Sequence, residues 1–184
     1  IILGKHTGAN ALKSKLEDYH INLNDEQFEK VFSQIKSLGD KGKCVTDDDL
    51  KAIALTELGS ARETPIKLKG LGLLCGDIVS PTSTVKLEID GVEKEISSTG
   101  VGAVDAALNA IRLLIQDTMD IELEEYNLEA INGGTDALAD VFVISSDNEG
   151  NKSTGRAINE DVVMASVLAV LDSINKLLLI KQSQ

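Results

Sequence analysis

The feature that most constrains the fold is an order of elements that occurs twice in the second half of the chain. Three strand patterns followed by a helix pattern cover residues 71–118, and the same order returns over residues 121–179. The helices align at an offset of 59 residues, so that Val104, Ala106 and Ala110 recur as Val163, Ala165 and Ala169. A three-stranded sheet with one helix is too small to bury its own apolar face. We therefore expect an α+β domain in which two βββα units pack on each other with pseudo-twofold symmetry.

The strand patterns have a period of two residues. Val85, Leu87 and Ile89 alternate with charged residues, and the Asp90-Gly91 pair after them favours a tight hairpin. The remaining strands are expected at 71–78, 121–131, 138–145 and 152–158, and the last helix at 161–178.

The first third of the chain has a helical period instead. Asn24 or Asp25 is positioned to cap a helix whose apolar stripe runs from Phe28 to Leu38, and Thr46 to cap one that starts with three aspartates. Contiguous acidic residues fan outward around a helix, so they complement the helix dipole better than they bind a metal. We predict a helical subdomain over 1–58 and, from its proline and basic residues, a linker over 59–70.

Composition excludes several classes of function. Eighteen basic against thirty acidic residues give a net charge of −12, which repels nucleic acid and anionic membrane surfaces. No apolar run approaches the roughly 20 residues that span a bilayer. Two histidines and two cysteines in unrelated contexts predict no metal site, no bound cofactor and free thiols in a reducing cytoplasm. The first residues, Ile-Ile-Leu-Gly, lead us to expect a piece of a longer protein.

The only candidate ligand loop is Gly-Val-Gly at residues 100–102, just before the first helix of the duplicated region. It lacks the third glycine of a dinucleotide fingerprint and follows an antiparallel strand, which argues against a nucleotide site. Glycines do let a ligand approach the positive end of a helix, where a carboxylate is held. A small amino acid fits this arrangement.

Several motifs resemble one enzyme family. LGKHTG at residues 3–8 resembles the LGKHSG that follows the catalytic barrel of 2-isopropylmalate and citramalate synthases, and TDDDL at 46–50 resembles the helix start that comes next. PTSTVKL, STGVGAVDA and NGGTDALADV resemble the C-terminal regulatory domain of the same family. The motifs span nearly the whole chain in the right order. Ala103 departs from the pattern, since the family often has proline at that helix start.

The resemblance implies a parent enzyme that condenses acetyl-CoA with a 2-oxo acid. The barrel that would carry the divalent metal and the base is not part of this sequence, so we expect the chain alone to be inactive. The family's regulatory domain forms a homodimer and binds the end product at the contact between subunits. That effector is leucine for isopropylmalate synthases and isoleucine for citramalate synthases.

The resemblance also assigns effector-binding residues by position. It implies an amide loop of Gly100, Gly102 and Val104, and a side-chain wall with an adjoining loop: Leu123, Tyr126, Ala130, Thr135, Asp136 and Ala137. Without the resemblance, we would interpret these wall residues as ordinary core residues. The small Ala130 favours leucine over isoleucine. His6 either assists the catalytic site of the full enzyme or only orients its own loop.

Two other interpretations remain open from sequence. The first is a pure dimerisation module that binds no ligand, and the second is an unrelated amino-acid sensor of the ACT-like type. An ACT-like domain has the order βαββαβ, so the order of elements separates that alternative from a repeated βββα unit.

Overall fold

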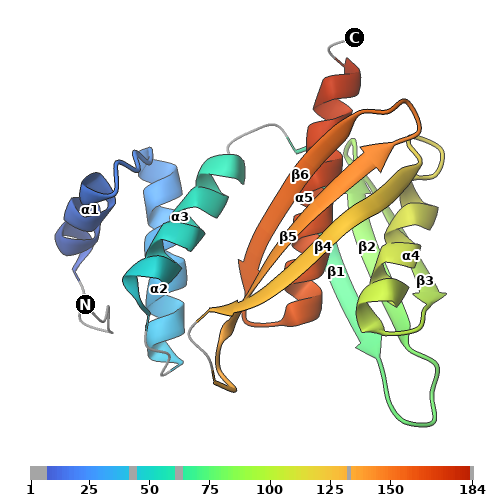
Figure 1. Cartoon of the computed structure of the whole chain (residues 1–184), viewed down its shortest axis with the longest axis horizontal. Helices are drawn as coiled ribbons and strands as arrows, with labels where there is room; N and C mark the ends of the chain where they lie inside the picture. The colour runs from blue at the N-terminus through green and yellow to red at the C-terminus, as the bar shows by residue number, and fades with distance from the viewer. Residues whose placement is uncertain (1–7, 42–44, 61–63, 132–133, 183–184) are drawn as a thin grey trace. The chain divides into compact units, whose positions relative to one another are not determined.

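The computed structural model describes residues 8–41, 45–60, 64–131 and 134–182. The chain divides into two compact units, Ile1–Arg62 and Glu63–Gln184. Within the described residues the first unit is helical, and the second holds two three-stranded antiparallel sheets and two helices (Figure 1). The predicted α+β class is confirmed.

The first unit consists of α1 (Ala9–Asp18), α2 (Asp25–Asp40) and α3 (Asp47–Ser60). Asn24 starts α2 with a capping box: its side chain accepts the N–H of Gln27 at 2.8 Å, and the Gln27 side chain accepts the N–H of Asn24 at 2.9 Å. The predicted stripe is buried at Phe28, Val31, Ile35 and Leu38. Phe32 lies at the edge of the stripe and stacks on Phe28.

Asp47 and Asp49 stabilise the N-terminus of α3. Asp49 is buried and its carboxylate accepts hydrogen bonds from the N–H and the hydroxyl of Thr46, at 2.8 and 3.0 Å. The ammonium of Lys15 on α1 hydrogen-bonds to Asp47 and, more than any other neighbour, lowers the pKa of that carboxyl below its usual value. The Thr46 hydroxyl in turn accepts the N–H of Asp49 at 3.3 Å, so Thr46 and Asp49 cap α3 reciprocally while Asp47 ties it to α1.

The second unit repeats one order of elements. β1 (Ile66–Leu74), β2 (Thr82–Ile89) and β3 (Val92–Thr99) precede α4 (Ala103–Ile115), and β4 (Ile121–Ile131), β5 (Leu138–Asp147) and β6 (Lys152–Asn159) precede α5 (Val162–Gln182). Each sheet follows chain order, β1-β2-β3 and β4-β5-β6. The order βββαβββα is incompatible with the ACT-like alternative.

The expected linker over 59–70 is too long, and the first strand does not start at residue 71. α3 continues to Ser60 and β1 begins at Ile66, which is buried and pairs with Ile89. The basic residues that suggested a linker, Lys67 and Lys69, project from a strand whose Ile66 and Leu68 face the core. Residues 75–81, partly assigned to that strand, form the β1–β2 loop instead.

The two halves share an irregularity as well as an order. The register of β1 on β2 shifts between Leu68 and Gly70, and that of β4 on β5 shifts between Leu123 and Glu125. Each bulge thus follows the third residue of the first strand in its unit. This agreement is consistent with duplication, while the pseudo-twofold axis itself stays a prediction.

One hydrophobic core joins both βββα units. Its members come from all parts of the second unit, from Ile66 and Val85 through Ile111 to Val143 and Ile174. α4 packs against β2 and β3, whereas α5 packs against β5 and β6 and also reaches β1 and α4 (Figure 1). α5 approaches β6 so closely that a Cβ on Gly155 would lie 1.9 Å from the carbonyl oxygen of Ala169.

α5 is the one helix among the described residues that is long and apolar enough to cross a membrane. Most of its apolar stretch is buried inside the second unit, including Val167, Val170 and Leu177. It therefore behaves as the central helix of a core.

A buried asparagine fixes the point where the chain enters the second unit. Asn175 on α5 is 7% exposed, and its side chain accepts the N–H of Ile66 and donates to the carbonyl of Ile66, both at 2.9 Å. The amide thus pairs with the free edge of β1 as a neighbouring strand would.

We predict that Asn175→Ala lowers the free energy of unfolding by about 2–4 kcal/mol, because it leaves a buried N–H and C=O without partners. Urea denaturation of the chain measures this. The matched control is Asn127→Ala, which removes an exposed amide whose side chain, among the described residues, bonds to Glu125 alone, and it should cost less than about 0.5 kcal/mol. Equal losses for the two variants would contradict the role given to Asn175.

Candidate functional site

A cavity of about 460 Å³ lies where the loop after β3 and the first turns of α4 meet the start of β4. Eight residues line it: Val101, Gly102, Ala103, Val104, Asp105, Leu108, Leu123 and Tyr126. The volume is within the range of small-molecule sites, which are mostly apolar with a few placed polar groups.

The floor of the cavity includes the open N-terminus of α4. Gly102 is the N-cap residue in an extended conformation, and no side chain caps the helix. The first intrahelical acceptor is the Gly102 carbonyl, bonded to the N–H of Ala106 at 2.9 Å. The N–H groups of Ala103 and Val104 therefore have no intrahelical acceptor and lie at the positive end of the helix dipole.

Gly100 positions the loop without lining the cavity. A Cβ at this residue would lie 2.4 Å from the amide nitrogen of Ala106 and 2.6 Å from a carboxylate oxygen of Asp105. The same carboxylate oxygen accepts the N–H of Val101 at 2.9 Å. The loop is thus packed directly on the first turn of α4, which only glycine at residue 100 allows.

The side walls are apolar and come from two elements. Val104 and Leu108 are four residues apart on one face of α4. On β4, Leu123 and Tyr126 are three residues apart, yet the bulge after Leu123 puts them on the same face, opposite Ser145 and Val143. A strand without this bulge would turn one of the two side chains away.

The hydroxyl of Tyr126 forms a hydrogen bond to α5. It lies 2.7 Å from the hydroxyl of Ser166, which itself donates to the carbonyl of Val162 at 2.7 Å. Since the Ser166 proton is used in that bond, Tyr126 donates to Ser166. The wall of the cavity is therefore hydrogen-bonded to the first turns of α5.

The equivalent end of α5 is closed. The Asp161 carboxylate accepts the N–H of Met164 at 2.8 Å, and the Asn159 side chain accepts the N–H of Asp161 at 2.9 Å. Of the two helix N-termini produced by the repeat, only that of α4 is free to receive a ligand.

Part of the predicted effector site is brought together in this cavity. Gly102, Val104, Leu123 and Tyr126 line it. Gly100 lies behind it, and the other wall and loop residues lie toward the far end of β4: Ala130, Thr135, Asp136 and Ala137. Ala130 is four residues beyond Tyr126 on an extended strand, about 13 Å away. Roles for these residues stay predictions, and His6 lies outside the described residues.

Sequence reasoning did not single out Val101, Ala103, Asp105 and Leu108 as cavity residues. The helical spacing of Val104 and Leu108 would have indicated that both side chains share one face of α4. The sequence gives no comparable indication for Asp105, because an aspartate in the first turn of a helix is ordinarily explained by the helix dipole.

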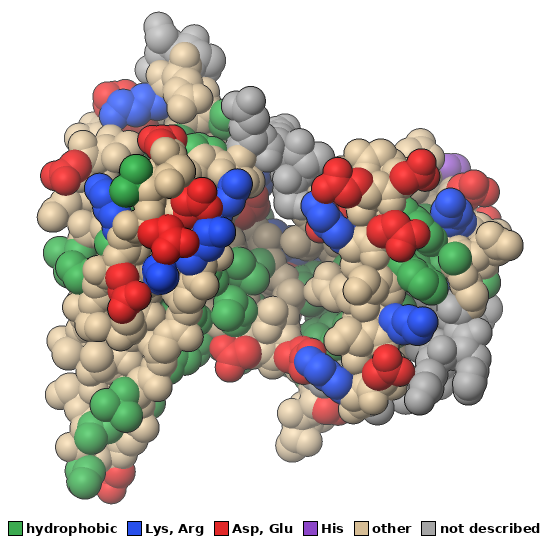
Figure 2. Space-filling view, turned by 180° about the vertical axis from the view of Figure 1, so that it is seen from behind, with side chains coloured by type: hydrophobic (Ala, Val, Ile, Leu, Met, Phe, Trp, Pro, Cys, Tyr) green, Lys and Arg blue, Asp and Glu red, His purple; other side chains and the backbone are tan. Residues whose placement is uncertain are grey.

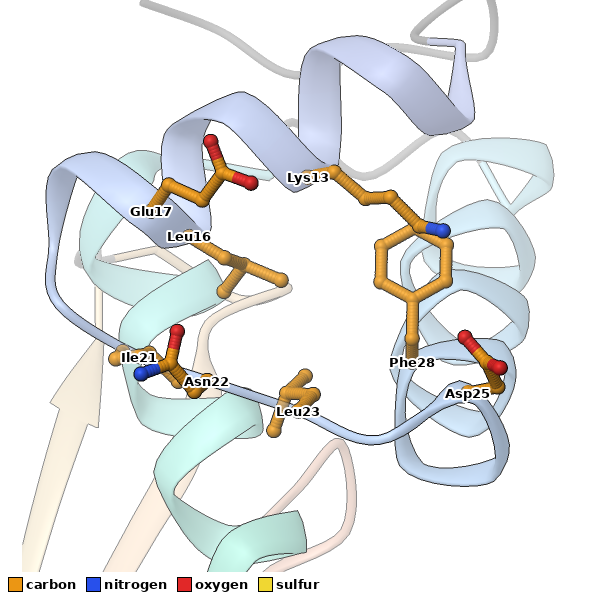
Figure 3. A pocket seen from close by; sticks show the side chains of 8 residues that line it. All are labelled: Lys13, Leu16, Glu17, Ile21, Asn22, Leu23, Asp25 and Phe28. Carbon is orange, nitrogen blue, oxygen red and sulfur yellow. The ribbon is translucent and has the colours of Figure 1, made fainter.

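A smaller cavity of about 150 Å³ lies in the first unit (Figure 3). It is bounded by α1, the loop after it and α2, with Leu16, Ile21 and Phe28 on its apolar side. Lys13 extends over the ring of Phe28, 4.8 Å from the centroid. Over the residues that the structure describes, no group of three or more His, Cys, Asp or Glu side chains is placed to hold a metal ion.

A repeated βββα order with an open helix end beside an apolar cavity is compatible with a regulatory domain. Comparison with known families agrees. Residues 44–178 match the LeuA allosteric (dimerisation) domain, and residues 1–43 match the homocitrate synthase post-HMGL domain-like family. The chain belongs to the LeuA allosteric (dimerisation) domain family.

Proteins named as 2-isopropylmalate or citramalate synthases are similar to this sequence over nearly the whole chain. A probable 2-isopropylmalate synthase of Methanopyrus kandleri is 48% identical over 96% of the chain and 36% of its own length. The 2-isopropylmalate synthase of Methanocaldococcus jannaschii is 44% identical over 97% of the chain and 35% of its own length. A putative (R)-citramalate synthase of Methanothermobacter thermautotrophicus is 42% identical over 100% of the chain and 37% of its own length. The chain thus spans little more than a third of these relatives.

We predict that Gly100→Ala lowers the free energy of unfolding by about 2–4 kcal/mol, because the added methyl group collides with the backbone of α4. Gly102→Ala is the matched control: its Cβ would meet nothing within 4 Å, and it should cost less than about 1 kcal/mol. Urea denaturation of both variants measures the difference. Similar losses would show that the loop is not packed as described.

Proposed function

We propose that the chain is the effector-binding and dimerising region of a 2-isopropylmalate synthase, in which leucine inhibits the condensation of acetyl-CoA with a 2-oxo acid. The observation that carries this proposal is the cavity at the open end of α4, in a chain whose family is described as allosteric and dimerising. The names of the relatives supply the reaction class.

The cavity has the chemistry that an aliphatic amino acid needs. The N–H groups of Ala103 and Val104 are available to its carboxylate, while Val104, Leu108 and Leu123 offer an apolar surface to its side chain. Burying a leucine side chain contributes roughly 2–3 kcal/mol, but micromolar binding requires about 8 kcal/mol. The charged ends of the ligand must therefore provide most of the affinity.

The alternative is the same region of a citramalate synthase with isoleucine as the effector, because relatives of both kinds are similar to the chain. Discrimination between the two amino acids concerns one methyl position and is worth about 1–3 kcal/mol. Ala130, whose small size favours leucine, is away from the cavity within one chain. We assign it, with Thr135, Asp136 and Ala137, to the face that meets the partner subunit in the proposed dimer.

The exposed side chains of the second unit support dimerisation. Tyr126 and Leu128 pair laterally with the fully buried Val143 and Val141, yet they are 36% and 46% exposed. They therefore face the helix layer at an edge strand that neither α4 nor α5 covers. Figure 2 also shows hydrophobic side chains at the projecting tip of this unit, where the β1–β2 loop carries the 96% exposed Ile78. A second copy of the chain would bury such surface.

The remaining functions belong to the whole enzyme. We propose that the catalytic barrel and its divalent metal lie in the part of the protein that is not in this sequence, that the chain alone is inactive and that the enzyme is cytoplasmic. His6 either assists that barrel or orients its own loop.

We expect isothermal titration of the chain with leucine to give micromolar binding, roughly tenfold or more tighter than isoleucine. Tighter binding of isoleucine would favour the citramalate synthase alternative. A stable dimer that binds none of the branched-chain amino acids would instead favour a pure dimerisation module.

We expect Leu128→Asp to raise the dissociation constant of the dimer at least tenfold, or about 1.4 kcal/mol, because it places a charge on the surface that the partner buries. Analytical ultracentrifugation measures this. Val92→Asp is the matched control, since Val92 is 58% exposed at the β2–β3 turn of the other sheet. An unchanged dimer in Leu128→Asp would remove β4 from the interface.

A further inference from the structure

We propose that the free edges of β1 and β4 are docking surfaces for each other: β1 of one copy of the chain pairs with β4 of a second copy, and β4 pairs with the partner's β1. The inference rests on the proposed dimerisation and adds which strands meet. Each sheet would then continue into the partner's sheet, in the order β3-β2-β1-β4-β5-β6. Two equivalent contacts about a twofold axis close the dimer.

The backbone of β1 has unpaired hydrogen-bonding groups along its free edge. Successive residues of an antiparallel strand direct their N–H and C=O groups alternately to one side and to the other. Ile66, opposite Ile89, directs both groups away from β2, to the side chain of Asn175. Leu71 and Leu73 pair with residues four and six positions before Ile89, so their groups also point to the free edge. Within the described ranges, no strand or side chain pairs with them there.

The free edge of β4 is built in the same way. Asp147, opposite the first residue of β4, donates its N–H to the carbonyl of Asn151 on the β6 side at 3.0 Å. Tyr126 and Leu128 pair with residues four and six positions before Asp147, so their N–H and C=O groups point away from β5. Leu73 is 42% exposed, much as its counterpart Leu128 is. Both edges therefore combine unpaired backbone groups with exposed apolar side chains, which is the kind of edge that an added strand covers.

Charge determines which edges fit each other. β4 contains four glutamates and no basic residue, whereas β1 contains Lys67 and Lys69 and no acidic residue. Two β4 strands side by side would repel each other, two β1 strands would gain no attraction, and β1 beside β4 is attracted. Over the part of the chain that the structure describes, Lys67, Glu125 and Glu129 take part in no ion pair. These charges are therefore available to a partner strand.

The charged and apolar side chains also lie on matching faces. Lys67 stands between two residues that face the core, so it projects from the outer face of its sheet. Glu125 and Glu129 alternate with the inward-facing residues of β4 and project from the outer face of theirs. In a continuous sheet the opposite charges would share the outer face, while Leu73 and Leu128 would join one apolar layer on the helix side.

A single partner can reach both edges because both adjoin α5. The Tyr126 hydroxyl lies 2.7 Å from that of Ser166, and Ile66 bonds to Asn175 at 2.9 Å. β1 and β4 thus lie beside one helix. A copy related by a twofold axis can place its β4 on β1 and its β1 on β4 at the same time, which leaves neither edge open for a third copy.

The test places one proline in each edge. Leu73→Pro and Leu128→Pro each remove an N–H that points away from the neighbouring strand, so the existing sheet keeps its hydrogen bonds. We expect each variant to raise the dissociation constant of the dimer roughly tenfold or more in analytical ultracentrifugation. Glu95→Pro is the matched control: it makes the same change on the free edge of β3 and should leave the dimer unchanged.

A mixture of the two variants identifies the pairing. The Leu73→Pro copy keeps an intact β4 and the Leu128→Pro copy keeps an intact β1, so one of the two contacts can form between them. We expect the mixed dimer to be roughly threefold or more tighter than the dimer of either variant alone. Impairment of only one variant would mean that this strand pairs with its own counterpart, and that result overturns the inference.

Hydrogen exchange on the unmodified chain gives an answer even if a proline variant does not fold. The N–H groups of Leu73 and Leu128 should exchange roughly tenfold or more slowly in the dimer than in the monomer obtained by dilution. Unchanged exchange, or dimers of both variants that match the Glu95→Pro control, overturns the edge pairing and leaves dimerisation intact. An unmodified chain that stays monomeric defeats the proposed dimerisation as well.

Discussion

The structure of the second unit depends on one constraint: its two helices do not offer enough apolar surface to cover the inner faces of both sheets. Each three-stranded sheet has one inner face to bury and one helix to cover it, and neither helix covers all three strands. α5 packs on β5 and β6 and also reaches β1 and α4, so it contacts both βββα units. Its backbone at Ala169 packs directly against Gly155 of β6. The result is a single core shared by both βββα units rather than two separate ones.

Because the two helices do not cover every strand, β4 is incompletely covered. Both proposed functions, effector binding and dimerisation, are assigned to this strand. Near its start, Leu123 and Tyr126 face the open end of α4 and form a cavity. Farther along, Leu128 faces the helix layer of its own unit but is covered by neither α4 nor α5. Ligand binding and dimerisation therefore use neighbouring parts of one strand, which is a physical basis for coupling the two.

Sequence reasoning predicted the elements whose signals are local. The alternation around Val85, the Asp90-Gly91 turn and the stripe from Phe28 to Leu38 each gave an element that the structure contains. It failed at the start of β1, because the charges of Lys67 and Lys69 resemble a linker until the pairing of Ile66 with Ile89 is known. Composition alone does not distinguish a solvent-facing strand side from a linker.

The candidate site was predictable only in part, for a similar reason. The glycine loop and Tyr126 came from motifs, and the cavity contains Gly102 and Tyr126. That Leu123 and Tyr126 share a face depends on a bulge, which is a property of the pairing between two strands and leaves no mark on either one. The distinction between the open end of α4 and the capped end of α5 likewise needed the hydrogen bonds of Asp161.

α5 also connects two places that are far apart in sequence. Ser166 holds Tyr126 at the cavity wall, and Asn175 holds Ile66 at the first strand of the domain. The two residues are about 14 Å apart along the axis of one helix, and close-packed interiors transmit strain. A displacement of Tyr126 that tilted α5 would therefore reach, without an intervening loop, the residue where the polypeptide enters the domain.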